Sequence, residues 1–534
     1  MFDKFAKLCL THGAIIRPLN IPLKDREYIG TCNPSIFWDG DRLRLILRRV
    51  NYALWSCNDQ YKFATQYGPL WYITGDSEHH LKTINYLCEL NGNDLSHTLI
   101  NTSKLDKEPI WEFVGLEDAR LVRWDGKLYG TGVRRDTTPN GQGRMELSEL
   151  DEEGNEISRV RIKAPGNDDS YCEKNWMPIL DMPYHYVKWC NPVEIVKANP
   201  ITGDCETVLI KEQPQDLEFY NTNGMGIRGS SQVIPWGEYR IAITHMCELW
   251  FNEKKQKSGT GYFEQFIVWD KDWNIVKLSE PFRFAGFSIE FTNGLAYKDG
   301  TFYIPFALQD NFSFMVSISE DVIRNFIFNN DKTYGNYTLN GNVYLEFFDN
   351  PFDSYKCMQL GNKYYNEGYY APSMILYEKA CEYNTFKTQD ELYDCMYMCG
   401  KSIASHGKSD DAEILLWDKM IDLNMNRSEG YLMASKYYIW RNRFSEAYTF
   451  AKLAYTLNNF NLNLPDSLSV EHIDEFDCEI EYLWALYNTE NYLECLPLAN
   501  NLKIKYSGNE NKMREIDNFL NCYENNKKNK YRVL

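Results

Sequence analysis

Short apolar strands that meet at tight turns repeat along the first 345 residues. Three copies place Asp-Gly between two runs of alternating apolar and polar residues, at positions 39–40, 125–126 and 299–300. A looser copy has Trp-Gly at 236–237, and a fifth is predicted around 199–204, within the region 176–210. Asp-Gly between alternating strands is a strong hairpin signal. The pattern therefore predicts an all-β region built from successive hairpins.

Hairpins that recur over a stretch of about 300 residues favour radial blades, because blades leave only short, protected sheet edges. We therefore predict a five-bladed β-propeller over residues 1–345, and a β-sandwich is the alternative. The chain of 534 residues exceeds the size at which a single core keeps growing, so further domains are expected.

After Pro351 the spacing of apolar residues changes to that of paired helices. Small and aromatic residues recur in four segments, at 360–380, 399–420, 434–454 and 484–498. This pattern resembles the tetratricopeptide repeat, in which small residues let two helices approach. We predict a multidomain protein with an all-α, tetratricopeptide-like solenoid at 352–524 and a flexible basic tail at 525–534. Such an array is typical of docking to a protein or a large acceptor.

Charge and cysteine usage exclude several classes of function. A formal net charge of −18 argues against binding along a nucleic-acid backbone. The 15 Cys are scattered without paired CxxC motifs or a Cys/His cluster, which predicts free thiols and no metal. The first residues mix charges with apolar side chains and no sustained apolar run follows, so we expect a cytoplasmic protein without a membrane span.

The segment 115–120, Gly-Leu-Glu-Asp-Ala-Arg, places two carboxylates and a guanidinium just before a predicted hairpin. Strand residues alternate faces, so Glu117 and Asp118 cannot both point the same way. One of them can serve a central pocket while the other supports its neighbours. An ordinary surface loop whose charges neutralise each other is the alternative.

Another apparent motif, GxGxxG at 224–229, is not interpreted as a dinucleotide-binding loop. That fingerprint needs a strand before it and a helix after it. Here the following residues lead into a hairpin, and Pro235 is unsuited to the middle of a helix.

Five short motifs give the propeller region a family resemblance. They are Asn33-Pro34-Ser35 with Arg48-Arg49, the segment 115–120, Glu173 to Pro178, Arg228 to Gln232 running on to Thr244-His245, and Ile289-Glu290-Phe291 with Gln309-Asp310. In this order they resemble the five-bladed β-propeller superfamily that includes glycoside hydrolase family 130, the mannoside phosphorylases, and related mannosyltransferase/phosphorylases.

The resemblance implies roles for individual residues. Asp118 matches the general acid of the family, although Ala119 replaces the usual Pro, and Glu117 and Glu290 are further catalytic candidates. Alternation between Ile289 and Phe291 also sends Glu290 to the face opposite both, which favours the central channel. Phosphate or a sugar diphosphate would be held by Arg48 or Arg49, Arg120, Lys174, Arg228 and His245. The sugar would be bound by Asn33, Glu173, Asn175, Trp176, Gln232 and Asp310.

Structural roles remain open for many of these residues: salt bridges between blades for the cations, core packing for Trp176, and simple burial for His245. No metal and no other cofactor is expected, because the nearest Asp-x-Asp, at 39–41, falls in a hairpin turn. Glu173 or Glu290 as a second catalytic carboxylate would distinguish a hydrolase from the other activities.

The resulting functional prediction is an inverting glycosyltransferase that moves a hexosyl unit, mannosyl by the resemblance, from an activated sugar to an acceptor. Its predicted partners are a carbohydrate with phosphate or a nucleotide sugar. The first alternative is an inverting β-mannoside phosphorylase, or hydrolase, that uses inorganic phosphate. The alternative from another class is a non-catalytic sugar-binding or protein-binding scaffold.

Overall fold

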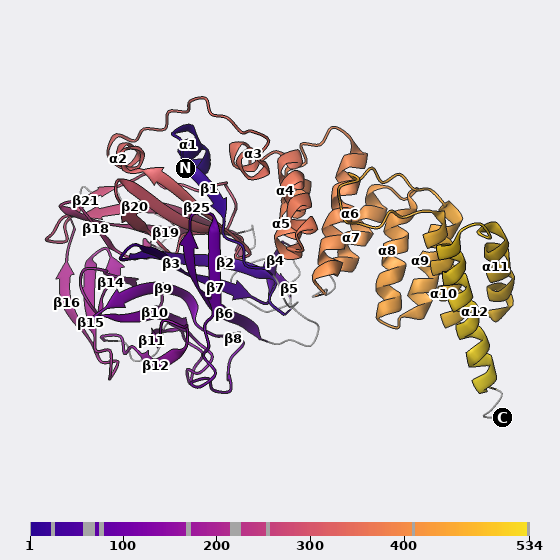
Figure 1. The fold of residues 1–534 in the computed structure, drawn as a ribbon, viewed down its shortest axis with the longest axis horizontal. Helices are drawn as coiled ribbons and strands as arrows, with labels where there is room; N and C mark the ends of the chain where they lie inside the picture. The colour runs from indigo at the N-terminus through magenta and orange to yellow at the C-terminus, as the bar shows by residue number, and fades with distance from the viewer. Residues whose placement is uncertain are drawn as a thin grey trace. The chain divides into compact units, whose positions relative to one another are not determined.

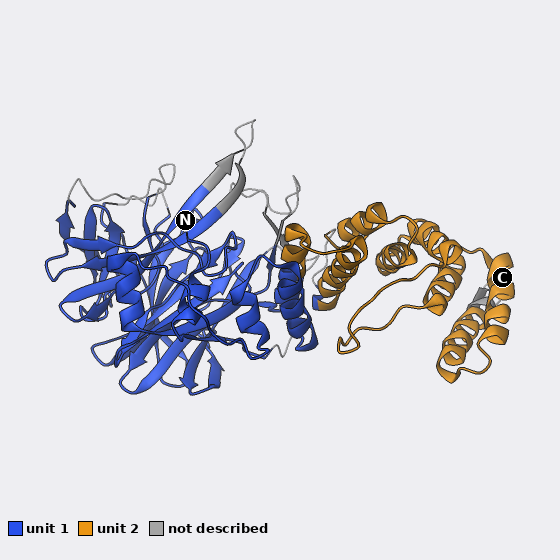
Figure 2. Ribbon diagram, turned by 90° about the horizontal axis from the view of Figure 1, so that it is seen from above, with its two compact units in different colours: residues 1–376, 406–408 blue, residues 377–405, 409–534 orange. Residues whose placement is uncertain are grey.

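The computed structural model describes residues 2–22, 27–56, 70–73, 80–166, 172–213, 226–251, 257–407 and 412–530. Within these ranges all strands precede residue 320, and all helices except the first follow them (Figure 1). The chain divides into two compact units, residues 1–376 with 406–408 and residues 377–405 with 409–534 (Figure 2).

Five antiparallel sheets of four or five strands form the propeller in the first unit. Blade 1 contains β2 (Gly30–Asp39), β3 (Arg42–Val50), β6 (Leu81–Asn91), β7 (Asp94–Leu99) and the short parallel strand β8 (Phe113–Val114). Blade 2 contains β9 (Glu117–Trp124), β10 (Lys127–Arg134), β11 (Arg144–Leu150) and β12 (Glu156–Arg161). Blade 3 contains β13 (Met177–Pro178), β14 (His185–Cys190), β15 (Val193–Ala198) and β16 (Cys205–Lys211).

Blades 4 and 5 complete the ring. Blade 4 contains β17 (Arg228–Gly229), β18 (Ile234–Trp236), β19 (Tyr239–Phe251), β20 (Lys257–Trp269) and β21 (Ile275–Leu278). Blade 5 contains β22 (Glu290–Phe291), β23 (Ala296–Lys298), β24 (Thr301–Leu308), β25 (Phe312–Ser319) and, from the start of the chain, β1 (Ile15–Pro18). Because β1 pairs with β25, the two ends of the region are joined within one blade. Two further strands, β4 (Ala53–Ser56) and β5 (Leu70–Ile73), pair only with each other.

The predicted hairpins are confirmed. The turn between β9 and β10 pairs Trp124 with Lys127, and both Asp125 (φ 48°) and Gly126 (φ 79°) are left-handed, as a two-residue hairpin turn requires. The turns after β2, β18 and β23 have the same two-residue length. The turn at 199–204 is also a hairpin, but it joins β15 to β16, away from the innermost strand of its blade.

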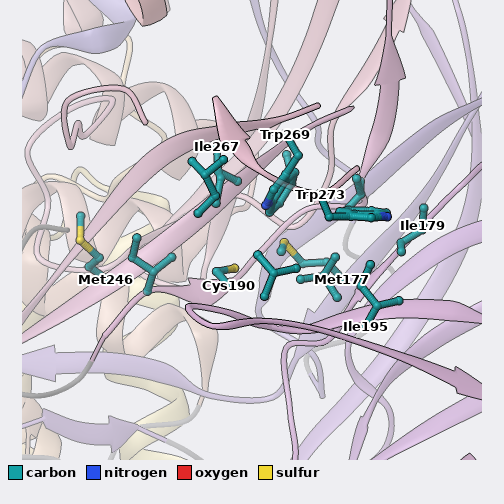
Figure 3. Packing of buried hydrophobic residues seen from close by; sticks show 14 of the residues in the cluster. Met177, Ile179, Cys190, Ile195, Met246, Ile267, Trp269 and Trp273 are labelled. Atoms are coloured by element: carbon teal, nitrogen blue, oxygen red, sulfur yellow. The ribbon is translucent and has the colours of Figure 1, made fainter. Parts of the chain in front are cut away.

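Hydrophobic residues fill the space between neighbouring blades. Between blades 3 and 4 a cluster of buried side chains combines Met177, Ile179 and Ile195 with Ile267 and Trp269 (Figure 3). At the centre of the ring, polar side chains connect the inner strands instead. The Gln232 amide donates hydrogen bonds to the Ser35 hydroxyl and to the Leu121 carbonyl, so it joins blades 4, 1 and 2.

The predicted all-α region is confirmed, and its four predicted helix pairs correspond to α4/α5, α6/α7, α8/α9 and α10/α11. The helices that follow the strands are α2 (Glu320–Asn329), α3 (Val343–Asp349), α4 (Ser354–Asn366), α5 (Tyr370–Tyr383), α6 (Gln389–His406), α7 (Ala412–Leu423), α8 (Ser428–Trp440), α9 (Phe444–Leu457), α10 (Glu475–Asn488), α11 (Tyr492–Lys505) and α12 (Glu510–Lys530), and α1 (Phe5–Thr11) precedes the strands. A side chain at Gly400 would collide with Trp417, so this glycine permits α6 and α7 to approach closely. The kinship with tetratricopeptide repeats stays a prediction.

Two predicted boundaries differ from the structure. The propeller's compact unit extends to residue 376, beyond the predicted end at 345, because Phe348 of α3 packs against Phe306 and Phe314 of blade 5. The expected flexible tail is helical as far as Lys530, and residues 531–534 lie outside the described residues. Across the described part of the chain, no helix is both long and apolar enough to span a membrane.

Candidate active site

Irregular backbone at the inner strands brings the predicted polar motifs of blades 1 and 2 together. The register of β2 against β3 shifts between Cys32 and Ser35, and that of β9 against β10 shifts opposite Asp118. Bulges of this kind re-aim side chains and occur often beside active sites. Asn33 (φ 46°) and Asp118 (φ 50°), which lie at the two bulges, both have left-handed backbone. Asn and Asp tolerate this conformation better than most residues.

The Asp118 carboxylate is the centre of the site. Its Oδ1 accepts a hydrogen bond from the Asn33 amide at 2.7 Å and another from Arg48 Nη1 at 2.9 Å. Its side chain is 16% exposed, so the carboxylate is accessible although it lies among buried groups. Both bonds involve Oδ1, and Oδ2 has no hydrogen-bond partner among the described residues. Oδ2 therefore has spare hydrogen-bonding capacity.

Nearby cations keep this carboxylate ionised. Burial acts to raise the pKa of Asp118, but the charges of Arg48, Arg120 and Lys174 and the hydrogen bond from Asn33 outweigh it, so the pKa is lowered from its ordinary value. The unliganded site therefore presents an anionic base at neutral pH.

The sequence left Arg48 and Arg49 as alternatives, and the structure brings only Arg48 to Asp118. Arg48 also donates to the Thr83 hydroxyl at 3.1 Å and to the Tyr52 hydroxyl at 3.2 Å, and neither partner was identified from the sequence. Arg49 points to the other face of β3, where it donates to the Tyr28 carbonyl at 2.6 Å. The pairing of Arg48 with a carboxylate suits a positioning role better than phosphate binding.

Arg120 is fully buried and connects three blades. It donates to the Asp118 carbonyl and to the Ser230 carbonyl, each at 2.8 Å, and to Asn175 Oδ1 at 3.4 Å. Burial lowers its pKa to about 10, which leaves it charged at neutral pH. Arg120 and Asn175 therefore fix the backbone that carries Asp118. The charge of Arg120 also helps to lower the pKa of the Asp118 carboxyl.

Two cations and a histidine of blades 3 and 4 form another side of the site: Lys174, which is exposed, Arg228, which is half-buried, and His245, which is buried. Arg228 and His245 are opposite each other in the β17–β19 pairing. His245 is 4% exposed and its Nδ1 is 2.9 Å from the Ser230 hydroxyl. Burial, together with the charges of Arg228, Lys174 and Arg120, lowers the pKa of His245 well below its ordinary value. His245 is therefore a neutral hydrogen-bonding group at neutral pH.

Asp310 lies beside the same cluster. It sits in the turn between β24 and β25 with left-handed backbone (φ 50°), and the side chain of Asn33 acts on its pKa. Burial raises its pKa to about 6, and the charges of Asp118 and Glu117 add to this effect while Arg48 and Asn33 oppose it. Glu117 is half-buried next to Asp118. Asn33 thus lies between one ionised carboxylate and one that holds its proton more readily.

Four predicted site residues have side chains that are buried and bonded to other parts of the protein. Glu290 is fully buried, and its carboxylate accepts backbone N–H bonds from Phe284 and Phe287 at 2.5 and 2.7 Å and from Ala285 at 3.1 Å. Alternation predicted that Glu290 faces the central channel, and its carboxylate is bonded to neighbouring backbone amides. Gln232 is fully buried and bonded to three other blades' inner strands.

Trp176 and Glu173 are the other two. The Trp176 ring is 1% exposed in the core between blades 2 and 3, so it has no face for a sugar. Its indole N–H donates to the Glu173 carboxylate at 3.0 Å, and the ammonium of Lys188 lies 3.6 Å from the same carboxylate. Core packing, the alternative weighed for Trp176, accounts for both residues.

One supporting residue was missed. The Asn293 amide donates to the carbonyls of Asn33 and Ala119, at 3.1 and 3.2 Å, and so holds the two bulges together. A polar residue two positions after the predicted strand residues 290–291 was the signal in the sequence. No cluster of His, Cys, Asp and Glu suited to a metal ion is found among the described residues.

Comparisons with known proteins give similarity in fold only. No protein-family model matches the chain, and no curated protein matches it. Among solved structures, the chain is similar to a β-1,2-mannobiose phosphorylase from Listeria innocua, with 12% identity, 58% of this chain and 96% of that one covered, and a TM-score of 0.36. It is also similar to a glycosyl hydrolase from Bacteroides ovatus, with 12% identity, 60% and 94% covered, and a TM-score of 0.38.

A third similar structure is MPT-4, a mannose phosphorylase from Leishmania mexicana, with 12% identity, 60% and 94% covered, and a TM-score of 0.33. Similarity at this level does not transfer an activity to this chain. The functional argument therefore rests on the geometry of the site.

Proposed function

We propose that the propeller is an inverting sugar-processing enzyme that transfers a hexosyl unit between phosphate and a sugar hydroxyl, with Asp118 as its acid/base. The observation that carries this proposal is the accessible Asp118 carboxylate, held on one oxygen by Asn33 and Arg48 and facing a group of cations. The mannosyl specificity comes from the motif resemblance alone.

In the direction of synthesis, Asp118 Oδ2 takes the proton of the acceptor hydroxyl as that oxygen attacks the anomeric carbon. The bond from the anomeric carbon to the phosphate oxygen breaks, and phosphate leaves with the electron pair on the opposite face. In the reverse direction the protonated carboxyl returns its proton to the bridging oxygen while phosphate attacks. Each direction is a single displacement and inverts the anomeric centre.

Lys174, Arg228 and His245 are proposed to bind the phosphate. Charge-assisted hydrogen bonds from Arg and Lys suit phosphate oxygens, and neutral His245 can donate one further bond. Phosphate is already an anionic nucleophile, so this reaction needs one carboxyl group and a cationic site. Inverting hydrolysis needs a second carboxylate to activate water. Glu290, one candidate for that base, is bonded to backbone amides. Glu173, the other candidate, is paired with Lys188 and accepts a hydrogen bond from the Trp176 indole.

Transfer from a nucleotide sugar is the second candidate, because the same cations can hold a diphosphate leaving group. The lowered pKa of Asp118 favours this direction, since synthesis requires an ionised base. The helical repeats are proposed to dock a large acceptor or a partner protein. A non-catalytic scaffold is the remaining alternative, and it predicts that Asp118→Asn changes no activity.

The test compares donors with the purified full-length protein. One arm supplies inorganic phosphate with β-mannosides, and the other supplies mannose 1-phosphate or a panel of nucleotide sugars with mannose as acceptor. Mass spectrometry of the products identifies which donor is consumed. We expect reversible turnover with phosphate and mannose 1-phosphate. Turnover with nucleotide sugars only would favour the second candidate, and no turnover in either arm would support the scaffold.

A further inference from the structure

Ser230 links the backbone that carries Asp118 to the histidine of the proposed phosphate site. It directly follows β17 of blade 4 and is fully buried. Its carbonyl accepts a hydrogen bond from Arg120 at 2.8 Å, and Arg120 also donates to the Asp118 carbonyl. Its hydroxyl oxygen lies 2.9 Å from His245 Nδ1. Because it is buried, Ser230 can act on a ligand only through these neighbours.

The His245 ring is held so that one nitrogen faces Ser230 and the other is left open. The Phe291 ring lies nearly perpendicular to it, at 83° with the centroids 5.1 Å apart, and the Tyr262 ring lies 5.7 Å away. Nδ1 is used by Ser230, whereas Nε2 has no hydrogen-bond partner among the described residues. Nε2 is also not one of the enclosed, unpartnered polar atoms in that part of the chain, so the 4% exposure of His245 includes it. A ligand can therefore reach Nε2.

The charge of the His245 ring depends on its surroundings. Burial and the charges of Arg228, Lys174 and Arg120 lower the pKa of His245 well below its ordinary value, although the charge of Asp118 opposes them. A neutral imidazole has one N–H donor and one acceptor nitrogen, and the hydrogen bond at one nitrogen determines the role of the other. The partner of Nδ1 therefore decides whether Nε2 meets a ligand with a proton or with a lone pair.

The burial of Ser230 determines the direction of its hydrogen bond to His245. Among the described residues, His245 Nδ1 is the one partner of the Ser230 hydroxyl. If Nδ1 carried the proton and donated it, the hydroxyl hydrogen would be left in the interior without an acceptor. A buried donor without an acceptor loses its bonds to water and gains none in return. If the hydroxyl donates instead, both groups are paired, and the ring proton lies on Nε2.

We propose that Ser230 is a positioning residue of the phosphate site: its hydroxyl donates to Nδ1 and so holds His245 in the tautomer whose Nε2–H can donate to a phosphate oxygen. With the other tautomer, the Nε2 lone pair would face an anion and repel it. This role rests on the proposed transfer reaction, because that reaction places phosphate beside His245. Residue 230 lies within the motif Arg228 to Gln232, which gave no role to its hydroxyl.

The tautomer is measured directly by ¹⁵N NMR of the full-length protein labelled at its histidines, without phosphate. His245→Gln identifies the His245 signals by their loss. We expect the wild type to show a protonated, pyrrole-like Nε2 and an unprotonated Nδ1 whose signal is shifted by an accepted hydrogen bond. In Ser230→Ala that shift should disappear, and the Kd for inorganic phosphate, measured by calorimetry, should rise about 2- to 12-fold, the usual worth of one hydrogen bond.

Ser231→Ala is the matched control. Ser231 is equally buried, and its hydroxyl bonds only to backbone, at the Gln232 carbonyl and the Ile243 amide. We expect this variant to leave the His245 signals and the phosphate Kd unchanged, even where it lowers stability. Ser230→Thr keeps the hydroxyl and should retain the wild-type signals, which a role of Ser230 in packing alone would not require.

A proton on Nδ1 in the wild type would overturn the proposal, and so would His245 signals that are the same in the wild type and Ser230→Ala. If Ser230→Ala fails to fold, the wild-type Nδ1 signal still shows whether that atom accepts a hydrogen bond, and an unshifted signal would also overturn the proposal. Failure of the wild type to bind phosphate would instead reject the proposed phosphate site, and the role of Ser230 in it, whichever tautomer is observed.

Discussion

Each compact unit contains a buried arginine that pairs with one or more carboxylates. The two clusters differ in whether a carboxylate oxygen is left without a hydrogen bond. In the propeller, Arg48 binds one oxygen of Asp118, whose other oxygen has no partner among the described residues. The surrounding charge is an excess of cations, which lowers the pKa of that carboxyl.

In the helical unit, Arg427 is surrounded by carboxylates instead. It pairs with Asp390, Asp394 and Glu429 at 3.2, 3.4 and 2.9 Å. Asp394 and Glu429 also accept backbone N–H bonds from residues 463 and 461 of the segment between α9 and α10. Asp394 of α6 and Glu429 of α8, both paired with Arg427, thus hold that segment against these two helices.

The comparison shows that burial and charge do not by themselves mark a functional site. Both arginines are almost completely buried, and both clusters are ionic. The propeller cluster differs because its carboxylate keeps one unbonded, accessible oxygen on left-handed backbone at a bulge. Strained backbone and spare hydrogen-bonding capacity together are the features that favour function.

The largest expected effect is at Asp118, in the propeller cluster. Asp118→Ala is expected to lower the rate of hexosyl transfer by about 10²–10⁴-fold, the usual contribution of acid/base catalysis. The measurement is the initial rate of product formation by mass spectrometry. Unchanged thermal unfolding serves as the control for folding, and full activity in this variant would contradict the assigned role.

A substitution in the Arg427 cluster should instead lower stability and leave the rate of transfer unchanged. Arg427→Ala leaves two buried carboxylates, Asp394 and Glu429, without their cation, so we expect a loss of about 3–5 kcal/mol in the free energy of unfolding of the helical unit. Transfer to a small acceptor should be unaffected. Urea unfolding followed by circular dichroism, alongside the rate assay, measures both quantities. A large fall in rate with unchanged stability would remove the contrast between the clusters.

A smaller effect is expected at the cationic side of the site. Arg228→Ala removes a charge-assisted bond to phosphate, worth about 1.5–3 kcal/mol, and should raise the Kd for inorganic phosphate by about 10- to 150-fold. Calorimetric titration with phosphate measures this directly. Arg240→Ala, farther along β19 and paired with Asp181, is the matched control. Equal phosphate binding by both variants would exclude Arg228 from the phosphate site.

The smallest effect is a pH dependence at Asp310. Its folded-state pKa is raised to about 6 from 3.8, so the folded protein binds more protons than the unfolded chain between these values, and stability falls as pH rises through that window. Asp310→Asn removes this cost. Its stability relative to the wild type should therefore increase from about pH 4 to pH 6 and then stay constant. Urea unfolding of both proteins across this range measures the difference, and a difference that is flat with pH would contradict the raised pKa.

The sequence was sufficient to predict the propeller, because each Asp-Gly hairpin is a local feature. It was also sufficient to predict the helix pairs, and the role that it indicated for Asp118 stays a proposal. The choice between Arg48 and Arg49 was not predictable, since it depends on which face of β3 meets blade 2. The fate of Glu290 depended on three backbone amides at 284–287, whose positions no periodicity reveals.

Trp176 and Gln232 illustrate the same limit for polar and aromatic residues. Their motifs resemble those of a sugar-binding family, but burial between blades determines what their side chains contact. The bulges that aim Asn33 and Asp118 arise from strand register, which requires knowledge of both partners. The side-chain positions that the sequence did not predict therefore depend on how strands and blades pair with one another.

The most direct test of the central claim is ³¹P NMR of the full-length protein with inorganic phosphate and a β-mannoside, run side by side for the wild type and Asp118→Asn. The account predicts a sugar 1-phosphate signal that grows with the wild type and is absent with Asp118→Asn, while both proteins remain folded. Equal growth of that signal with the two proteins would contradict the role of Asp118 in transfer.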